Sequence, residues 1–329
     1  SYFSAVVFVG YAGQFGWKYG LSSTWIGIGN AFIGSLLAWV ILGRRTRVMT
    51  KYLHAATMPD FFGKRFESNA LRIAASAIVF IFLVPYTASI YNGLSRLFGL
   101  AFDIPYSVCV IVMAALTGAY VILGGYMATA INDFIQGIIM LLGIVAVIGA
   151  VLSGQGGFIA AVGKLAELNS DVPVTMGQPG AFTSFFGPDP LNLLGVVILT
   201  SLGTWGLPQM VQKFYAIKSE KAISTGTVIS TVFAIVISGG CYFLGGFGRL
   251  FDNPSLYKED GSVIYDGVIP YMLSTLPDVL IGIVIVLVLS ASMSTLSSLV
   301  LTSSSTLTLD FIKGNLVKDM SEKKQLHVM

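Results

Sequence analysis

The sequence predicts an all-α polytopic membrane protein. Hydrophobic residues make up 55% of its 329 residues and charged residues only 11%, whereas about 25% of the residues of an ordinary soluble domain are charged. The mean hydropathy is +0.81. Apolar runs of roughly 20 residues recur along the chain, and this is the length of helix needed to cross a hydrocarbon core of about 30 Å.

Eight apolar segments, separated by charged residues, glycine and proline, are expected to form helices that cross the membrane. Some of them are longer than the bilayer is thick, so they must tilt, kink or extend into water. In chain order, the predicted spans cover residues 1–17, 22–43, 70–100, 105–124, 127–153, 190–216, 221–250 and 278–312.

Lysine and arginine are concentrated in alternate connections, which predicts the orientation because basic loops remain in the cytoplasm. The connections after the second and sixth spans and the tail after the eighth are basic, and all three lie on one side if every span crosses. Short amphipathic helices are expected on the outer surface at 156–169 and Val268–Pro277. The basic residues are Arg44, Arg45, Arg47, Lys51, Lys64, Arg65, Lys213, Lys218, Lys221, Lys313, Lys318, Lys323 and Lys324, and the outer acidic residues are Asp171, Asp189, Asp252, Glu259, Asp260 and Asp266.

Composition also excludes several function classes. Cys109 and Cys241 lie inside apolar runs and are expected to be packed free thiols rather than a disulfide. The two histidines, His54 and His327, fall in a loop and in the tail. The chain therefore offers few of the histidine side chains that a metal hydrolase or a histidine-based triad needs. The net charge of +3 is small and gives no signal for nucleic acid. We therefore do not predict an enzyme.

The eighth span is unusually rich in hydroxyl groups. Twelve of the twenty-one residues from 290 to 310 are serine or threonine. At about 100° per residue, Ala291, Ser294, Thr295 and Ser298 share one face of a helix, and Ser297 lies beside that face. Such hydroxyls can bond back to their own helix or join helices, and we interpret residues 302–308 in that way.

For residues 291–298 a sodium site is the better interpretation. A small hard cation needs several oxygen ligands without much charge. Two hydroxyls and a few backbone carbonyls meet this need, but an intact helix has no free carbonyls, so a broken helix should lie nearby.

Asp133, in the stretch GGYMATAINDFIQG, is an acid near the cytoplasmic start of the fifth span, between Asn132 and Gln136. An ionisable residue inside a span is costly and indicates function by default. Alternatively, Asp133 caps or anchors the helix at the membrane interface. Both interpretations stay open at this point.

Five blocks in order give the chain a resemblance to a known family: SAVVFVGYAG, TMPDFFGKRF, GGYMATAINDFIQ, GLPQMVQKFYAIKSEKA and SASMSTLSS. Together they resemble the sodium/solute symporter family, which includes proline, pantothenate, sugar and sialic acid carriers. The resemblance implies a leucine-transporter-type fold of two inverted five-helix repeats in one transporter domain, 1–329. Residues 1–154 would form most of the first repeat and 190–312 part of the second, whose last two helices would be missing, and 313–329 would be a cytoplasmic tail.

The resemblance also implies binding residues. The principal sodium site would use the carbonyls of Phe3 and Ala291 and the hydroxyls of Ser294 and Thr295. A second sodium site would use the Asp133 carboxylate with the hydroxyls of Ser297 and Ser298. Substrate candidates are the polar or aromatic groups Ser4, Asn30, Tyr91, Asn92, Trp205 and Gln209.

Taken together, the sequence predicts a sodium-coupled symporter of the plasma membrane that imports a small organic solute by alternating access. Na⁺ would be the coupling ion, with no other cofactor. Early in the first helix this chain has Val6 and Val7, where sugar carriers look to have polar side chains. This difference favours a carboxylate solute such as an amino acid or pantothenate. The alternative is the membrane input domain of a signalling protein built on the same fold. Residues 1–329 alone are expected not to transport.

Overall fold

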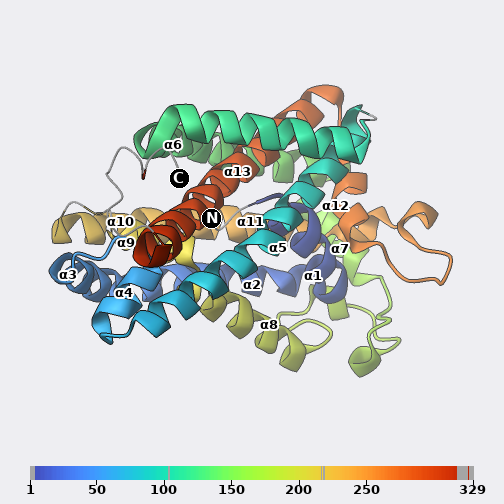
Figure 1. Cartoon of the computed structure of the whole chain (residues 1–329). Coiled ribbons are helices and arrows are strands. Elements are labelled where there is room, and N and C mark those ends of the chain that lie inside the picture. The colour runs from blue at the N-terminus through green and yellow to red at the C-terminus, as the bar shows by residue number, and fades with distance from the viewer. Residues whose placement is uncertain (1–3, 103, 216, 218, 317–324, 326–329) are drawn as a thin grey trace.

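We describe the chain from a computed structural model, which places residues 4–102, 104–215, 217, 219–316 and 325. Over these residues the fold is helical, and extended pairing is limited to isolated bridges such as Asn169 with Pro179. Figure 1 shows long helices packed side by side, with α13 running diagonally between α5 and α6. The prediction of an all-α protein is confirmed.

The α-helices are α1 (Ala12–Tyr19), α2 (Thr24–Gly29), α3 (Arg44–Tyr52), α4 (Met58–Arg65), α5 (Asn69–Phe102), α6 (Tyr106–Gly154), α7 (Phe158–Ala166), α8 (Pro190–Gly203), α9 (Pro208–Tyr215), α10 (Glu220–Ala234), α11 (Gly240–Gly245), α12 (Tyr265–Ser274) and α13 (Asp278–Ser305). The π-helical segments are η1 (Val6–Tyr11), η3 (Asn30–Leu37), η4 (Trp39–Gly43), η8 (Ile235–Gly239) and η11 (Thr306–Leu316). The short 3₁₀ turns are η2 (Gly20–Ser23), η5 (Pro173–Thr175), η6 (Ala181–Thr183), η7 (Thr204–Gly206), η9 (Gly248–Phe251) and η10 (Pro254–Leu256).

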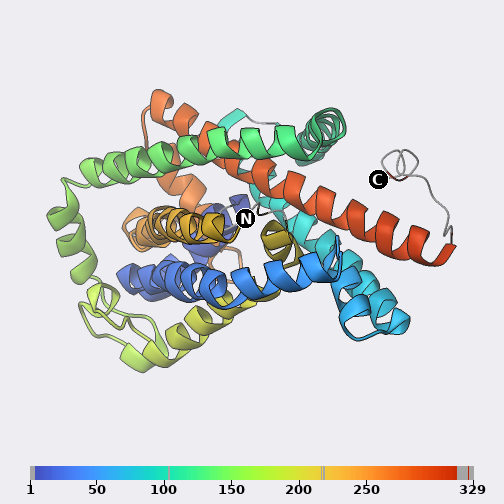
Figure 2. The same cartoon turned by 90° about the vertical axis from the view of Figure 1, so that its left-hand side faces the viewer.

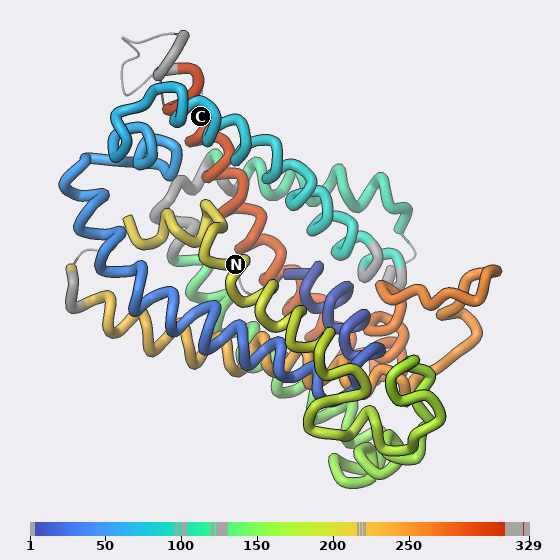
Figure 3. Tube along the Cα trace, turned by 90° about the horizontal axis from the view of Figure 1, so that it is seen from below, coloured from blue at the N-terminus to red at the C-terminus, as the bar shows by residue number. Residues whose placement is uncertain are grey.

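The first two predicted spans form one helical run, Val6–Tyr52, of 47 residues. The chain changes direction inside it at Gly20, where φ is +62°. This left-handed conformation is accessible to glycine because it lacks a Cβ. Figure 3 shows the short first helix on one side of the turn and the longer second one running back on the other. The expected boundary between residues 17 and 22 is therefore present as a turn.

No break separates the fourth and fifth predicted spans, because α6 continues from Tyr106 to Gly154, but its two parts run in different directions. Glycine lowers helix stability by only about 1 kcal/mol, so the Gly124–Gly125 pair does not end a helix. A straight helix of this length would reach about 74 Å at 1.5 Å per residue. Figure 2 shows instead that the early part of α6 is seen end-on while the later part runs across the view.

The sixth predicted span is broken. Helix α8 and turn η7 lead to α9 at an angle of 48°. The break falls at Leu207, whose backbone is extended (φ −69°, ψ 119°), directly before Pro208. Proline disfavours a helical conformation in the residue before it, and it lacks an N–H to continue the helical bonds. The sixth span is therefore two helices joined at an extended residue.

By length and composition, five of the described helical runs could cross a membrane, and the bent pair α8–α9 makes a sixth. The sequence predicted about eight. The difference arises because Val6–Tyr52 contains two predicted spans and because residues 106–119 form a shorter apolar stretch. Helices form at both positions where surface helices were expected, as α7 and α12. The surface location is wrong for α12, because Val268, Ile269 and Met272 are fully buried.

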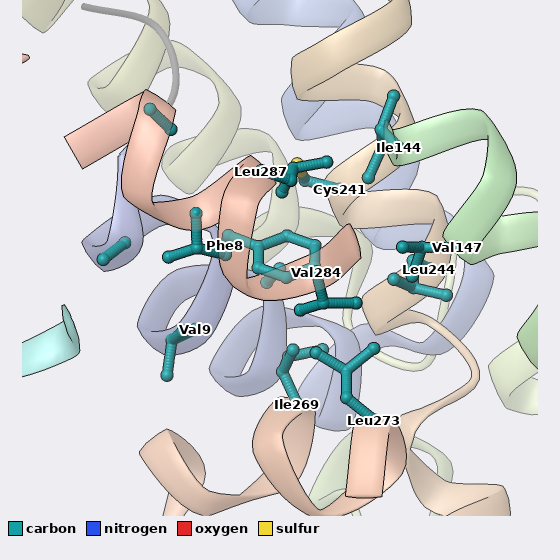
Figure 4. Packing of buried hydrophobic residues seen from close by; sticks show 14 of the residues in the cluster. Phe8, Val9, Ile144, Val147, Cys241, Leu244, Ile269, Leu273, Val284 and Leu287 are labelled. Carbon is teal, nitrogen blue, oxygen red and sulfur yellow. The ribbon is translucent and has the colours of Figure 1, made fainter. Parts of the chain in front are cut away.

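The core lies where the first helix meets α6, α11, α12 and α13. Figure 4 shows Phe8 and Val9 together with Ile144, Leu244 and Val284, all of which are buried. Glycines permit the closest approach, because a Cβ on Gly16 or on Gly245 would collide with the backbone of the other helix. Small residues serve this purpose in membrane helices, where close packing replaces the hydrophobic effect.

The charge asymmetry leads to a test of orientation. Tyr52, in the basic connection, and Asp260, in the acidic one, are both exposed, whereas the native Cys109 and Cys241 are buried. In intact cells, an impermeant thiol reagent should label Asp260→Cys and should label Tyr52→Cys only after the membrane is opened. Labelling in the reverse pattern would show that the assigned orientation is wrong.

Candidate functional site

The start of the first helix lies directly against the hydroxyl-rich part of α13. The backbone N–H of Ala5 donates a hydrogen bond of 3.2 Å to Oγ of Ser292, and both residues are fully buried. The neighbouring Ser4 is 1% exposed, and its hydroxyl makes no hydrogen bond to any residue that the structure describes. Phe3, the expected carbonyl ligand, lies outside the described residues.

The two expected sodium-binding hydroxyls are buried on the same face of α13. Thr295 is fully buried and Ser294 is 8% exposed. The Thr295 hydroxyl donates to the Ala291 carbonyl at 3.0 Å, which is the back-bonding that serine and threonine adopt in helices. A hydroxyl that donates its proton in this way keeps lone pairs that can face a cation. The geometry is therefore compatible with both a packing role and a ligand role.

The ladder beyond residue 298 shows the same back-bonding and adds a contact to another helix. Ser303 and Ser304 donate to carbonyls three residues earlier, and Ser305 to the one four residues earlier. Thr302 donates to the Ser298 carbonyl and lies 2.9 Å from Oε1 of Gln212 on α9. These contacts are those of hydroxyls that satisfy their own helix or join two helices, as the sequence indicated.

The three residues of the expected second site lie at similar depth on adjacent helices. Ser297 and Ser298 both donate to the Ser294 carbonyl at 3.0 Å, which brings their hydroxyls side by side. Helices α6 and α13 pack antiparallel, with Gly143 against Leu287. Asp133 precedes Gly143 by ten residues, and Ser297 follows Leu287 by ten. Because the two helices are antiparallel, both residues lie about 15 Å from the contact in the same direction. One carboxylate oxygen of Asp133 is buried without a hydrogen bond to a described residue.

Among the substrate candidates, Tyr91 and Asn92 lie beside the first helix. They precede Gly93 on α5, where a Cβ would stand 3.1 Å from the backbone carbon of Ala5. Tyr91 also packs on the apolar cluster that joins α5 to Leu296 of α13. Both side chains are half-buried. The structure thus places this part of α5 against the start of the first helix.

Gln209 is the most unusual of the candidates. It is 2% exposed, follows the break in the sixth span, and neither polar atom of its amide has a hydrogen bond to a described residue. A buried polar group without a partner costs about 1–3 kcal/mol. A bound solute would remove this cost by supplying a donor and an acceptor.

Two other candidates already have partners within the protein. Asn30 accepts from Ser201 and donates to Ser238, each at 3.3 Å, so it joins three spans. The indole N–H of Trp205 donates to the Ile33 carbonyl at 2.9 Å, and its ring lines a cavity of about 330 Å³ between the second, sixth and seventh spans.

Sequence reasoning missed Ser292 and Ser95. Ser292 lies about 60° around the helix from Thr295, and its position three residues before Thr295 was the signal that could have found it. Ser95 is 3% exposed on α5, one turn beyond Tyr91, and its hydroxyl has no partner among the described residues. No pattern in the sequence distinguishes Ser95 from a serine that satisfies its own helix.

A broken span, buried polar groups without partners among the described residues, and several helices long and apolar enough to cross a bilayer are together typical of a multi-pass membrane protein. The model of the sodium:solute symporter family matches residues 1–329. The chain belongs to the sodium:solute symporter family, and it is a multi-pass plasma membrane protein.

Two relatives show the extent of the similarity. The chain is 29% identical over 310 residues to the sodium/pantothenate symporter of Haemophilus influenzae, covering 93% of this chain and 60% of that protein. It is 31% identical over 300 residues to the sodium/proline symporter of Staphylococcus aureus, covering 89% of this chain and 55% of that protein. The chain therefore spans little more than half the length of these relatives.

A solved structure shares the fold. It is that of a Na⁺-coupled sialic acid symporter in a substrate-bound outward-open state, with a TM-score of 0.79 and 19% sequence identity. The match covers 99% of this chain and 66% of that one. The leucine-transporter-type fold expected from the resemblance is confirmed.

The contrast between Gln209 and Asn30 gives a prediction about stability without solute. Gln209→Met removes an amide that has no partner among the described residues, so the purified protein should keep or raise its melting temperature. Asn30→Leu leaves Ser201 and Ser238 without their shared partner, so it should reduce the free energy of unfolding by about 1–3 kcal/mol and lower the melting temperature. Equal losses in the two variants would indicate that Gln209 is a structural residue.

Proposed function

We propose that the chain forms the ion- and solute-binding part of a sodium-coupled symporter that imports a small organic carboxylate. The observation that carries the proposal is the contact between the start of the first helix and the buried hydroxyls of α13, made through Ala5 and Ser292. Membership of the family and the names of the two relatives support the same function. Residues 1–154 and 190–312 would belong to the two inverted repeats.

Sodium would bind between these two helices. Ser294 and Thr295 would supply hydroxyl oxygens, and Phe3 and Ala291 would supply carbonyls. Because the ligands come from both helices, an ion bound there would hold the first helix against α13. Such an ion shifts the equilibrium toward the conformation in which the helices are close, to the extent that it binds that conformation more tightly.

A second sodium ion would be held by Asp133 together with Ser297 and Ser298. The buried carboxylate oxygen of Asp133 supports this assignment because it has no hydrogen bond to a described residue. An ion there would neutralise a charge that is otherwise costly within a span. One charge that crosses per 100 mV contributes about 2.3 kcal/mol, so two ions could drive strong accumulation of solute.

The solute would occupy the space bordered by Ser4, Tyr91, Asn92 and Gln209. Ser4 and Gln209 carry buried polar atoms without partners among the described residues, and they could hydrogen-bond a carboxylate or an amide. Asn30 and Trp205 were also expected here. Because both are bonded within the protein, we assign them to the walls of the site. The relatives named for proline and pantothenate support a carboxylate, and Val6 and Val7 disfavour a sugar.

The sodium assignment can be tested with matched hydroxyl deletions in the intact transporter. Ser294→Ala and Thr295→Ala should each raise the sodium concentration for half-maximal uptake at least tenfold, about 1.4 kcal/mol, because each removes an oxygen ligand from a buried site. Asp133→Asn should also weaken sodium coupling, because an amide lacks the charge. Uptake of labelled proline or pantothenate at varied sodium concentration measures the effect.

Ser304→Ala is the control, because Ser304 bonds only to its own helix among the described residues, at 3.2 Å from the Leu301 carbonyl. Helix-joining hydroxyls contribute about 0.6 kcal/mol on average, less than a threefold change. If Ser294→Ala and Ser304→Ala alter the sodium dependence equally at matched expression, the hydroxyl face is a packing feature and the sodium assignment fails.

A further inference from the structure

A buried carboxylate at the cytoplasmic end of the eighth span is bonded to a loop far away in the sequence. Oδ2 of Asp310, on η11, accepts a hydrogen bond of 2.6 Å from the hydroxyl of Thr57. Both residues are almost fully buried, at 2% and 1% exposure. A bond this short is typical of a hydroxyl that donates to an ionised carboxylate, and such bonds are stronger than neutral ones.

Thr57 is also the residue that starts α4. Its hydroxyl accepts from the backbone N–H of Asp60 at 3.1 Å, while Asp60 accepts in turn from the N–H of Ala56. The Thr57 hydroxyl is therefore the N-cap of α4, and the Asp60 side chain ties the residue before the cap to the first turn. The one hydroxyl thus caps α4 and donates to α13's extension η11, so α4 cannot shift without breaking one of the two bonds.

Further contacts complete this junction. Arg72 of α5 packs its stem on Gly63 of α4, where a Cβ would come within 2.8 Å. Ser76 of α5 donates to the Thr306 carbonyl of η11 at 3.4 Å. Tyr215, at the end of α9, lies within electrostatic range of the carboxylates of Asp60 and Asp310. Figure 3 shows α4 at the upper left, beside the end of the eighth span.

Four elements therefore meet at α4: the loop between the second and third spans, the start of α5, the end of α9 and the end of the eighth span. Two of them, α9 and α13, carry the proposed solute and sodium residues. The basic loops place this junction on the cytoplasmic side. A tie at this point can close the cytoplasmic end of the site because it holds the end of the eighth span against α4, which also packs on α9.

We propose that Thr57 and Asp310 are positioning residues that form a cytoplasmic tie, which closes the inner side of the protein and must open for solute to leave. Sodium and the tie would then favour the same conformation. By thermodynamic linkage, loss of the tie weakens apparent sodium binding even though no sodium ligand is changed. This coupling to sodium rests on the proposed function, whereas the closing role of the tie does not.

The closing role can be measured with a thiol reporter. Thr306 is fully buried in the junction, and the native cysteines are also buried, so Thr306→Cys in inside-out vesicles should react slowly with an impermeant maleimide. Adding Thr57→Val, which removes only the hydroxyl, should accelerate the reaction at least fivefold. Thr57→Ser, which keeps the hydroxyl, should restore the slow rate.

Asp310→Leu tests the same bond from the other side and serves if Thr57→Val fails to fold. It should accelerate labelling to a similar extent, and the double variant should react no faster than either single one, because both remove one shared interaction. Acceleration by Asp310→Leu without acceleration by Thr57→Val would overturn the tie, since Asp310 would then act through other partners. Unchanged labelling in both variants would overturn it as well.

The coupling between the tie and sodium binding is measured separately, by sodium-dependent uptake. Thr57→Val should raise the sodium concentration for half-maximal uptake at least threefold while the maximal rate stays within twofold, a split that simple loss of folded protein does not produce. Uptake that is independent of sodium in the unmodified protein, combined with accelerated labelling in Thr57→Val, would refute the proposed function and support the tie. Unchanged labelling with normal sodium-driven uptake would refute the tie alone.

Discussion

The absence of water in the hydrocarbon core is the constraint on which the rest of this structure depends. Each polar group in a span must find a partner within the protein. Thr295, Thr302 and Ser305 do so by donating to carbonyls of their own helix, and Asn30 does so by joining three spans. Against this background, the buried polar atoms of Ser4, Asp133 and Gln209, unpaired among the described residues, stand out. Ser4 lies beside the hydroxyl-rich α13, Gln209 follows the break in the sixth span and Asp133 lies on α6, and at each of these positions an ion or a solute could supply the missing partner.

The close approach of the helices depends on a different property, the lack of side chains at particular glycines. Gly16 and Gly245 allow the first helix and α11 into backbone contact, and the left-handed Gly20 turns the chain between the first two spans. These contacts fix the first helix against the seventh span, while Ser292 fixes its start against α13. The site is therefore assembled from helices that are distant in sequence, and its geometry follows from packing at glycines several turns away.

The sequence was sufficient for the helical class, because composition and helical periodicity are local properties. The roles assigned to the hydroxyl face of α13 and to Asp133 stay predictions. The sequence did not reveal that residues 106–154 form one helix, because glycines near residue 125 resemble a boundary but cost a helix too little to end it. The break at Leu207 was also missed, although Pro208 was its signal. Partners such as Ala5 with Ser292, or Thr57 with Asp310, could not be predicted, because only the packing of distant segments brings them together.

A structure of the intact protein, determined once with sodium and once with a large organic cation in its place, would test the central claim most directly. With sodium, an ion should lie between residues 3–4 and α13, within coordination distance of the Ser294 and Thr295 hydroxyl oxygens. Without sodium, that density should disappear and the first helix should separate from α13. A sodium ion bound elsewhere, or a first helix in the same place in both structures, would contradict the account.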